Sequence, residues 1–424
     1  SACPDGSSCY RWEMNIAQIC FAGLVLNAGF SQANEWLEFR GPGGQGFGGK
    51  TVKKWTNKEV VWKIPIAPKG WSSPVVSKGK IILTGALEKG GKTHLMVLAL
   101  DEKTGADVWQ TSLFTPAEKE LLARHSKNGL ASATPVIRDG VIYVHFGHMG
   151  TAAVKLDDGK VIWKELYSYE PVHGGGSSPI LVGDLMVFSA DGKSDPVLVA
   201  LNAKTGKLVW KTPRTSTVKR TFSFATPTLV KDAGRDLIIS PASGMVGAYD
   251  PKDGKEVWKV SNKEGWSLVS KPVVMDGMVY TSTGFAKANL LAIKLNGARG
   301  EVTDSNLKWT AKKGIPNTPS FIASDGVLYV LDDTGALTCF DAKSGDSKWR
   351  EKLPGNFSSS PMLSDGALYC VTEDGVCYVV EVSPKGGKII FQTDLEEKTF
   401  ASPIVVNEAL ILRSENHLYK ISGN

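Results

Sequence analysis

The chain has 424 residues, a net charge of +6 and a composition typical of globular proteins, with 42% hydrophobic and 9% aromatic residues. This composition excludes an intrinsically disordered or fibrous protein. No run of Lys and Arg is longer than two, which disfavours nucleic-acid binding. Three of the six cysteines lie within the first 20 residues, so the remainder cannot build a disulfide-rich scaffold.

Residues 1–33 predict a segment that is removed during export. Residues 15–28 are apolar but too short to span a bilayer, and small residues follow at the two positions that signal peptidase recognises. The surroundings of Cys20 do not match a lipoprotein acylation box. We therefore expect one mature domain, residues 34–424, that is periplasmic or secreted, without a lipid anchor or an integral membrane span. A short membrane anchor and a cytosolic chain with an apolar N-terminus are the alternatives.

A turn that ends in Gly, followed four residues later by Trp, recurs along the chain. Asp or Asn can hydrogen-bond its own backbone, and Gly accepts the positive φ of a tight turn, so the phrase predicts two strands joined by a turn. The Trp can pack against the next repeat. The copies are Asp101–Gly105 with Trp109, Asp157–Gly159 with Trp163, Asn202–Gly206 with Trp210, Asp250–Gly254 with Trp258, and Asp341–Gly345 with Trp349.

A second phrase alternates with the first: Ser or Thr, then Pro, then an apolar run. Pro is tolerated at the first residue of a strand, so each copy predicts the start of one. Copies lie 42 to 61 residues apart, the length of a four-stranded propeller blade. The eight strand-opening prolines are Pro74, Pro135, Pro179, Pro227, Pro272, Pro319, Pro361 and Pro403; Lys271 replaces Ser or Thr in one copy.

The two ends of the repeat region predict how the propeller closes. Residues 401–424 hold three strands without a terminal Trp, whereas Trp62 precedes the first complete repeat. Together these segments complete one blade, which removes exposed sheet edges. We therefore predict an all-β fold: an eight-bladed, monomeric β-propeller of four-stranded antiparallel blades, closed by N- and C-terminal strands in one blade.

The loops that lead into the Pro-opened strands should ring one mouth of the central channel. Cationic and aromatic side chains in these loops could hold a planar anion or an extended acidic peptide. The structural alternative is that the aromatic residues plug the channel and the charges are solvated. The predicted partner-binding rim comprises Trp71, His125, Asn128, His173, Arg220, Phe222, Trp266, Lys271 and Phe357.

Two metal hypotheses and one disulfide need separate consideration. His145 and His148 could chelate zinc or copper only if Gly147 bends the chain, since strand positions i and i+3 face opposite sides. Residues 191–195 offer two carboxylates for calcium, but they form a hairpin tip. Neither metal is predicted. Cys370 and Cys377 flank a turn, and the sequence leaves open whether they form a bridge or stay as two thiols.

The Ala-x-Asp-x-x-Thr-Gly-x-x-x-Trp phrase resembles the repeats of the pyrroloquinoline quinone (PQQ)-type propellers, the quinoprotein alcohol dehydrogenase-like superfamily, from about Trp36 to the C-terminus. The resemblance implies the fold. Dehydrogenases of that superfamily use PQQ with Ca²⁺, an Asp base and usually an adjacent-cysteine disulfide. This chain has no adjacent cysteines, and Glu264 stands alone as a well-placed carboxylate.

The chain is also similar to the periplasmic propeller subunit of the outer-membrane β-barrel assembly machinery. We therefore predict an exported, non-catalytic binding or assembly scaffold of the bacterial cell envelope, which uses the channel mouth for a protein or peptide partner and needs no cofactor. The alternative is a PQQ-dependent dehydrogenase-like oxidoreductase that binds a quinone at the same face with Ca²⁺. His125, His173 and Lys271 would then be the candidate catalytic residues.

Overall fold

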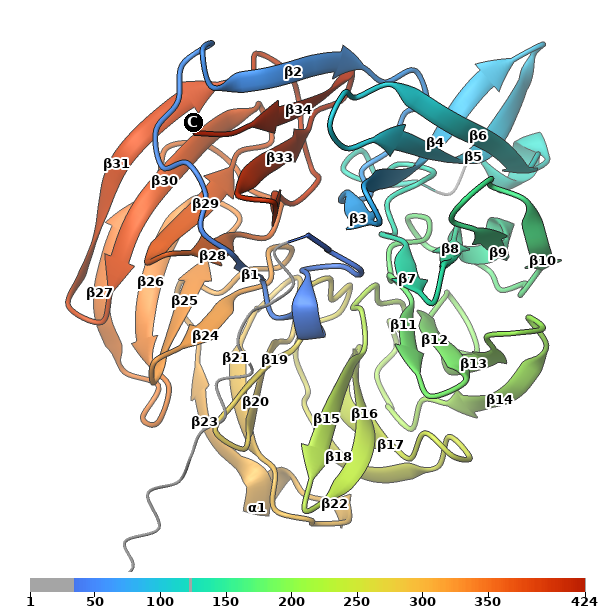
Figure 1. The fold of residues 1–424 in the computed structure, drawn as a ribbon. Coiled ribbons are helices and arrows are strands. Elements are labelled where there is room, and N and C mark those ends of the chain that lie inside the picture. Colours follow the sequence, from blue (N-terminus) through green and yellow to red (C-terminus); the bar gives the residue numbers. More distant parts are fainter. Residues whose placement is uncertain (1–33, 122–123, 424) are drawn as a thin grey trace, which may run out of the picture. The chain divides into compact units, whose positions relative to one another are not determined.

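The computed structural model describes residues 34–121 and 124–423. The predicted export segment, with its cysteines, lies outside these residues. Eight sheets, each built around four antiparallel strands, surround a central channel, as the ribbon in Figure 1 shows. The prediction of an eight-bladed propeller is confirmed.

Blades 1 to 4 follow one another along the chain. Blade 1 comprises β3 (Val75–Ser77), β4 (Lys80–Lys89), β5 (Lys92–Asp101) and β6 (Asp107–Phe114). Blade 2 comprises β7 (Val136–Arg138), β8 (Val141–His145), β9 (Thr151–Lys155) and β10 (Val161–Glu165). Blade 3 comprises β11 (Ile180–Val182), β12 (Leu185–Ala190), β13 (Val197–Asn202) and β14 (Leu208–Pro213). Blade 4 comprises β15 (Thr228–Asp232), β16 (Arg235–Ala242), β17 (Met245–Tyr249) and β18 (Glu256–Ser261), and β22 (Gly300–Glu301) pairs with its outer edge.

Blades 5 to 8 complete the ring. Blade 5 comprises β19 (Val273–Met275), β20 (Met278–Ser282), β21 (Leu290–Lys294) and β23 (Leu307–Ala311). Blade 6 comprises β24 (Ile322–Ser324), β25 (Val327–Leu331), β26 (Ala336–Asp341) and β27 (Ser347–Lys352). Blade 7 comprises β28 (Met362–Ser364), β29 (Ala367–Val371), β30 (Val376–Ser383) and β31 (Gly386–Asp394). Blade 8 joins β32 (Ile404–Val406), β33 (Ala409–Arg413) and β34 (His417–Ile421) to β2 (Val60–Pro65), which confirms the predicted closure.

Helices are few and short among the described residues. They are α1 (Thr303–Asn306) and the 3₁₀ turns η1 (Pro42–Gly44), η2 (Glu118–Glu120) and η3 (Gly147–Met149). No helix in this part of the chain is long and apolar enough to cross a membrane. Of these turns, η2 lies in the long loop between blades 1 and 2.

Five of the recurring tryptophans link their blade to the next, whereas the Trp258 N–H donates to Asp232 of its own blade at 3.3 Å. Five indole N–H groups donate to backbone carbonyls of the following blade at 2.8–3.1 Å. A Cβ on Gly206, in the turn of blade 3, would lie 2.5 Å from the Trp163 ring of blade 2. The Gly of the motif is therefore needed both for its positive φ and for this contact. We call the five tryptophans the tryptophan girdle: Trp109, Trp163, Trp210, Trp309 and Trp349.

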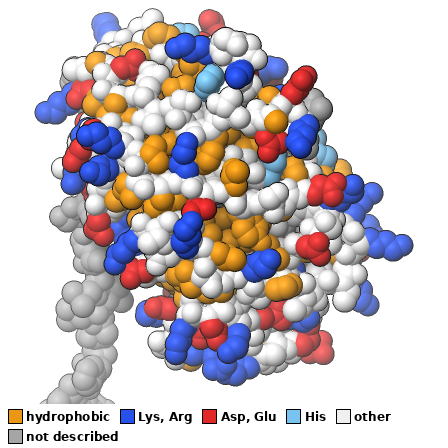
Figure 2. Space-filling model, turned by 90° about the vertical axis from the view of Figure 1, so that its right-hand side faces the viewer, with side chains coloured by type: hydrophobic (Ala, Val, Ile, Leu, Met, Phe, Trp, Pro, Cys, Tyr) orange, Lys and Arg blue, Asp and Glu red, His pale blue; other side chains and the backbone are white. Residues whose placement is uncertain are grey.

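The residue before each girdle tryptophan points to solvent, because strand side chains alternate between faces. On the adjacent outer strands β10 and β14, Ile162 and Val209 are 42% and 48% exposed, while Trp163 and Trp210 are 8% exposed. This side of the propeller faces the viewer in Figure 2, where hydrophobic side chains lie among charged ones.

One repeat departs from the predicted register. In seven blades the inner strand begins one residue after its Pro, but β24 begins at Ile322, three residues after Pro319. The sequence-based placement of this strand at Pro319 was therefore wrong by two residues. Phe321, which is fully buried, occupies the position that Pro has in the other blades.

The open question about Cys370 and Cys377 has a geometric answer. In the ladder between β29 and β30, Cys370 lies opposite Tyr378, and Cys377 lies opposite Val371. Adjacent strand positions face opposite sides, so the two thiols belong to different hydrophobic clusters. Both are buried free thiols.

The segment before the first blade plugs one end of the channel. It contains η1 and β1 (Phe47–Gly48), which pairs in parallel with β28, the inner strand of blade 7. Figure 1 shows η1 in the centre of the ring. Trp36 is 2% exposed and exchanges backbone hydrogen bonds with Val76 of β3. We call residues 36–48 the plug.

Candidate functional site

A cavity of about 690 Å³ opens at one mouth of the channel. Loops that precede the inner strands line it, as the repeat pattern predicts. Phe39 of the plug is part of its lining. Loops between the second and third strands reach the same cavity and contribute Phe285 and Asp333, because antiparallel pairing ends the second strand where the first begins.

A ring of hydroxyl side chains lines the cavity where the inner strands begin. In seven of the eight blades the residue is the Ser or Thr one position before Pro, or before Phe321 in blade 6. All seven are at most 6% exposed. We call them the hydroxyl belt: Ser73, Thr134, Ser178, Thr226, Ser320, Ser360 and Ser402.

Each belt hydroxyl accepts a backbone N–H from the preceding blade. The Ser73 N–H donates to the Thr134 hydroxyl at 3.0 Å, and the pattern repeats at 2.9–3.0 Å around the ring. The Ser402 N–H donates to Ser73 and links blade 8 to blade 1. Lys271 holds the eighth position without a hydroxyl, so this ring of contacts is interrupted between blades 4 and 5.

Aromatic and cationic side chains form the rim above the belt. The Arg220 guanidinium carbon lies 4.2 Å from the centre of the Trp266 ring, a cation–π contact, and Phe285 packs on the edge of that ring. His125, His173 and Phe222 form a series of edge-on contacts with ring centres 5.3 and 5.4 Å apart. Trp71 and Phe400 pack together at 4.8 Å.

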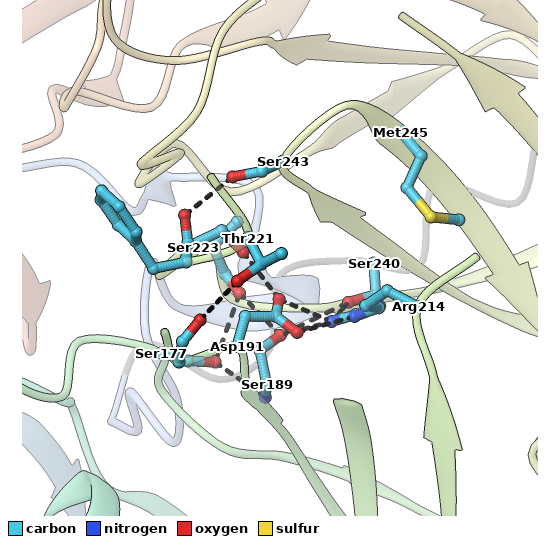
Figure 3. Close-up of polar contacts among 12 residues, drawn as sticks. Ser177, Ser189, Asp191, Arg214, Thr221, Ser223, Ser240, Ser243 and Met245 are labelled. Carbon is cyan, nitrogen blue, oxygen red and sulfur yellow. Dashed lines mark hydrogen bonds and ion pairs between the residues drawn. The ribbon is translucent and has the colours of Figure 1, made fainter. Parts of the chain in front are cut away.

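A buried ion pair holds the loop that carries Arg220 and Phe222. Arg214 donates to both carboxylate oxygens of Asp191, at 2.9 and 3.0 Å, and Ser223 also donates to this carboxylate. Figure 3 shows these side chains, with Ser189 and Ser240 around the guanidinium. Both charged side chains are almost fully buried. An unpaired buried charge is energetically costly. The network therefore fixes Arg214, at the start of the rim loop, and Ser223, further along it, against Asp191 of blade 3.

Ion pairing engages several of the charged residues near the mouth. Lys127 pairs with Glu373 at 2.7 Å, and Glu264 lies 3.3 Å from Lys287. Asp333 accepts the Asn317 N–H at 2.6 Å, while burial raises the pKa of this carboxyl group. Arg220 has no carboxylate partner within the described residues, so its charge is directed towards Trp266 and the cavity.

Seven of the nine predicted rim residues line the cavity together: Trp71, His125, Asn128, His173, Arg220, Phe222 and Trp266. Asn128 donates to the backbone carbonyls of His173 and Gly175, so it orients a neighbouring loop. His173 adopts a left-handed φ of 66°, which turns its loop towards Phe222. Belt residues and Phe285 were not predicted.

The other two predicted residues lie elsewhere. Lys271 is 1% exposed, and its ammonium is directed towards the plug, 3.8 Å from the Glu38 carboxylate. Burial lowers the pKa of Lys271, which Glu38 partly offsets. Phe357 is fully buried and packs against Tyr378. Neither side chain belongs to the rim. The prediction failed for both because position in a loop does not specify whether a side chain points into the channel or into a blade.

The histidines considered for metal binding have other contacts. His145 stacks on Phe188 and its Nδ1 contacts the Thr151 hydroxyl at 2.8 Å; burial lowers its pKa to about 3. His148 Nε2 contacts a backbone carbonyl at 3.0 Å. Asp191, considered for calcium, is paired with Arg214 instead. Across residues 34–121 and 124–423, no group of three or more metal-ligating side chains is found.

These features define a Trp-docked eight-bladed propeller with a blind, aromatic-rimmed cavity at one channel mouth. Its repeats place it in a known family. The family described as outer membrane protein assembly factor BamB matches residues 43–165, 93–324 and 300–382, and the chain belongs to that family.

Relatives agree with this assignment, and solved structures share the fold. Outer membrane protein assembly factor BamB of Yersinia pestis is 23% identical over 333 residues, which cover 76% of this chain and 78% of the relative. The crystal structure of BamB from Moraxella catarrhalis has a TM-score of 0.60 at 14% identity, covering 86% of this chain and 97% of that one. At this identity the structural likeness shows the fold alone.

Dehydrogenases share the fold as well. Quinoprotein ethanol dehydrogenase of Pseudomonas aeruginosa is 28% identical over 270 residues, but these cover only 41% of that enzyme and 55% of this chain. A europium-containing methanol dehydrogenase structure has a TM-score of 0.73 at 13% identity, covering 91% of each chain.

The residues of the mouth do not fit a calcium–quinone pair. Calcium prefers six to eight oxygen ligands with several carboxylates. Asp333 is the single carboxylate in the described lining of the cavity, and its Oδ2 already accepts the Asn317 backbone N–H. Trp266 and Arg220 could stack on a planar ring, but their mutual contact already occupies one face of the indole.

Proposed function

We propose that this protein is an exported, non-catalytic scaffold of the bacterial cell envelope, whose channel mouth binds an extended segment of a protein partner. Membership of the BamB family supports an assembly role, since relatives carry the name outer membrane protein assembly factor. In the proposed setting the protein lies in the periplasm and takes part in outer-membrane protein assembly.

The aromatic rim is the observation that carries this proposal. Recognition of protein segments relies on a few aromatic and arginine side chains set in a pocket, which the paired Arg220 and Trp266 provide. Phe285 is 54% exposed next to them, although large apolar side chains are usually buried. A cavity of about 690 Å³ lies within the usual size range of ligand-binding pockets.

Photo-crosslinking in growing cells tests this proposal. Benzoylphenylalanine replaces Phe285 at the mouth or, as a matched control, Leu208, which is 49% exposed on the outer strand β14. We expect the mouth position to crosslink to an envelope assembly component or an unassembled outer-membrane protein, and the outer position to give no such product. The proposal fails if Phe285 yields no envelope crosslink or if both positions crosslink equally.

Titration with PQQ and Ca²⁺ tests the enzyme alternative directly. Calorimetry and visible absorption should show no saturable binding to the wild-type protein, because the described lining of the mouth offers calcium a single carboxylate. Micromolar binding that is lost in an Arg220→Ala variant would overturn the scaffold proposal.

A further inference from the structure

The belt hydroxyls each have a proton that the protein does not use. A Ser or Thr hydroxyl offers one donor and two acceptor lone pairs. The backbone N–H of the preceding blade occupies an acceptor site on each one, as for Ser360, which accepts from Ser320 at 3.0 Å. No described residue accepts a hydrogen bond from any of the seven. Their O–H donors are therefore free.

The direction of these donors follows from their surroundings. All seven side chains are buried and all line the cavity. Their free O–H groups can therefore donate only to a molecule inside the cavity. The neighbouring hydroxyls behave differently. Ser359, one residue before Ser360, donates to the Val371 carbonyl at 2.8 Å, and Ser177 donates to Ala225. A buried donor without a partner is energetically unfavourable, so a ring of such donors favours a guest rich in acceptor oxygens.

The charges next to the belt favour an anion as that guest. Lys271 occupies the eighth belt position, and its backbone N–H donates to Ser320. Arg40 of the plug donates to the Phe321 carbonyl at 2.8 Å, while its Nε and Nη1 are buried without a partner. Glu38 faces Lys271, with its carboxylate 3.8 Å from the ammonium. The region just below the belt therefore carries more positive than negative charge.

We propose that the hydroxyl belt is an oxyanion site, which takes a carboxylate carried by the extended segment that the aromatic rim binds. This inference rests on the proposed function, because the rim would hold the side chains that flank the carboxylate. O–H donors form short, strong hydrogen bonds to carboxylate oxygens, and burial strengthens them. The carboxylate can be the C-terminus of a chain or the side chain of Asp or Glu.

Three short peptides separate these possibilities by calorimetric titration at pH 7. They are acetyl-Phe-Ala-Phe with a free C-terminus, the same peptide as its C-terminal amide, and acetyl-Phe-Glu-Phe amide. We expect at least one carboxylate peptide to bind with a Kd tenfold or more below that of the neutral amide. The tighter binder identifies the source of the carboxylate. Equal affinities for all three would overturn the oxyanion site but leave the peptide-binding mouth in place.

A matched pair of double variants locates the site. Ser178→Ala with Ser360→Ala removes two belt hydroxyls, whereas Ser177→Ala with Ser359→Ala removes two buried hydroxyls that do not line the cavity. The belt variant should lose at least fivefold of the preference for the carboxylate peptide, with the neutral amide unaffected. The control variant should keep the preference. Equal loss in both variants would contradict the assignment.

Thermal unfolding of each variant separates a structural role from a binding role, since both pairs remove hydrogen bonds between or within blades. If the belt variant does not fold, the comparison of the three peptides on the wild-type protein still decides the proposal. Absence of binding by every peptide would overturn both the oxyanion site and the peptide-binding mouth.

Discussion

The tryptophan girdle and the channel mouth are built in different ways. In the girdle one contact is repeated: a tryptophan of one blade packs on a glycine of the next and donates to a nearby carbonyl. At the mouth, each loop has its own anchor, such as the Asp191–Arg214 pair or the hydrogen bonds of Asn128. Repetition spreads stability over many similar contacts. The mouth instead depends on a few residues, each of which should matter strongly and locally.

Asp191→Asn should produce the largest loss of stability. The substitution leaves the Arg214 charge buried without its counter-ion, and breaking a buried pair in this way costs about 3–5 kcal/mol. Urea unfolding measures this loss. Because Ser223 also loses a charged partner, the loop that carries Arg220 should become accessible to proteases first.

Glu170→Gln is the matched control for this loss. Glu170 pairs with Lys193 at 2.8 Å next to the same hairpin, but both side chains are largely exposed. Exposed pairs contribute little, so its urea midpoint should equal that of the wild type. A similar midpoint for Asp191→Asn would mean that the buried pair does not anchor the mouth.

Gly206→Ala tests the girdle and should cost about 2–4 kcal/mol. Alanine there would adopt a φ of +74° and place its Cβ 2.5 Å from the Trp163 ring. Gly183→Ala isolates the backbone contribution, since Gly183 has a φ of +55° and no atom within 4 Å of the added Cβ. That variant should lose only about 1–2 kcal/mol in urea unfolding. If the two variants are equally stable, the tryptophan contact is not the reason for the glycine.

Acid should weaken the region near the mouth through His145. Burial lowers its pKa to about 3, whereas an unfolded His has a pKa near 6.5. Between these values the unfolded chain binds a proton that the folded chain does not, so stability falls as the pH decreases, by up to about 1.4 kcal/mol per pH unit. Urea unfolding at pH 7, 5.5 and 4.5 should give a flatter profile for His145→Gln than for the wild type. His94→Gln, at a partly exposed site in blade 1, should keep the wild-type slope, and an unchanged slope in His145→Gln would contradict this assignment.

The girdle could be predicted from the sequence because its contacts depend on local spacing. Gly206 and Trp210 lie four residues apart, and their turn and strand follow from residue type alone. The closure of blade 8 was predictable for the same reason, from the incomplete repeats at both ends. Where a local cue misleads, the prediction fails: Pro319 resembles a strand start, but β24 begins three residues later.

The mouth could be predicted only in part, since its geometry depends on contacts between residues distant in sequence. The repeat pattern places Trp71, Arg220 and Trp266 near the channel. It does not reveal that Lys271 is directed towards Glu38 of the plug, 233 residues earlier in the chain. Phe285 was missed because only the loops before the inner strands were considered. The antiparallel order of the strands would have indicated the second set of loops.

Trp266→Ala should have the smallest effect on stability and a clear effect on binding. The Arg220–Trp266 contact is partly exposed, so its loss should cost only about 0.5–1 kcal/mol in urea unfolding. The Kd of the peptide that binds most tightly should nevertheless rise at least tenfold, because aromatic residues in a pocket contribute most to recognition. Trp349→Ala, a girdle variant, should do the reverse and lower the urea midpoint without changing the Kd. If both substitutions change the Kd equally, the division between a stabilising girdle and a binding mouth is wrong.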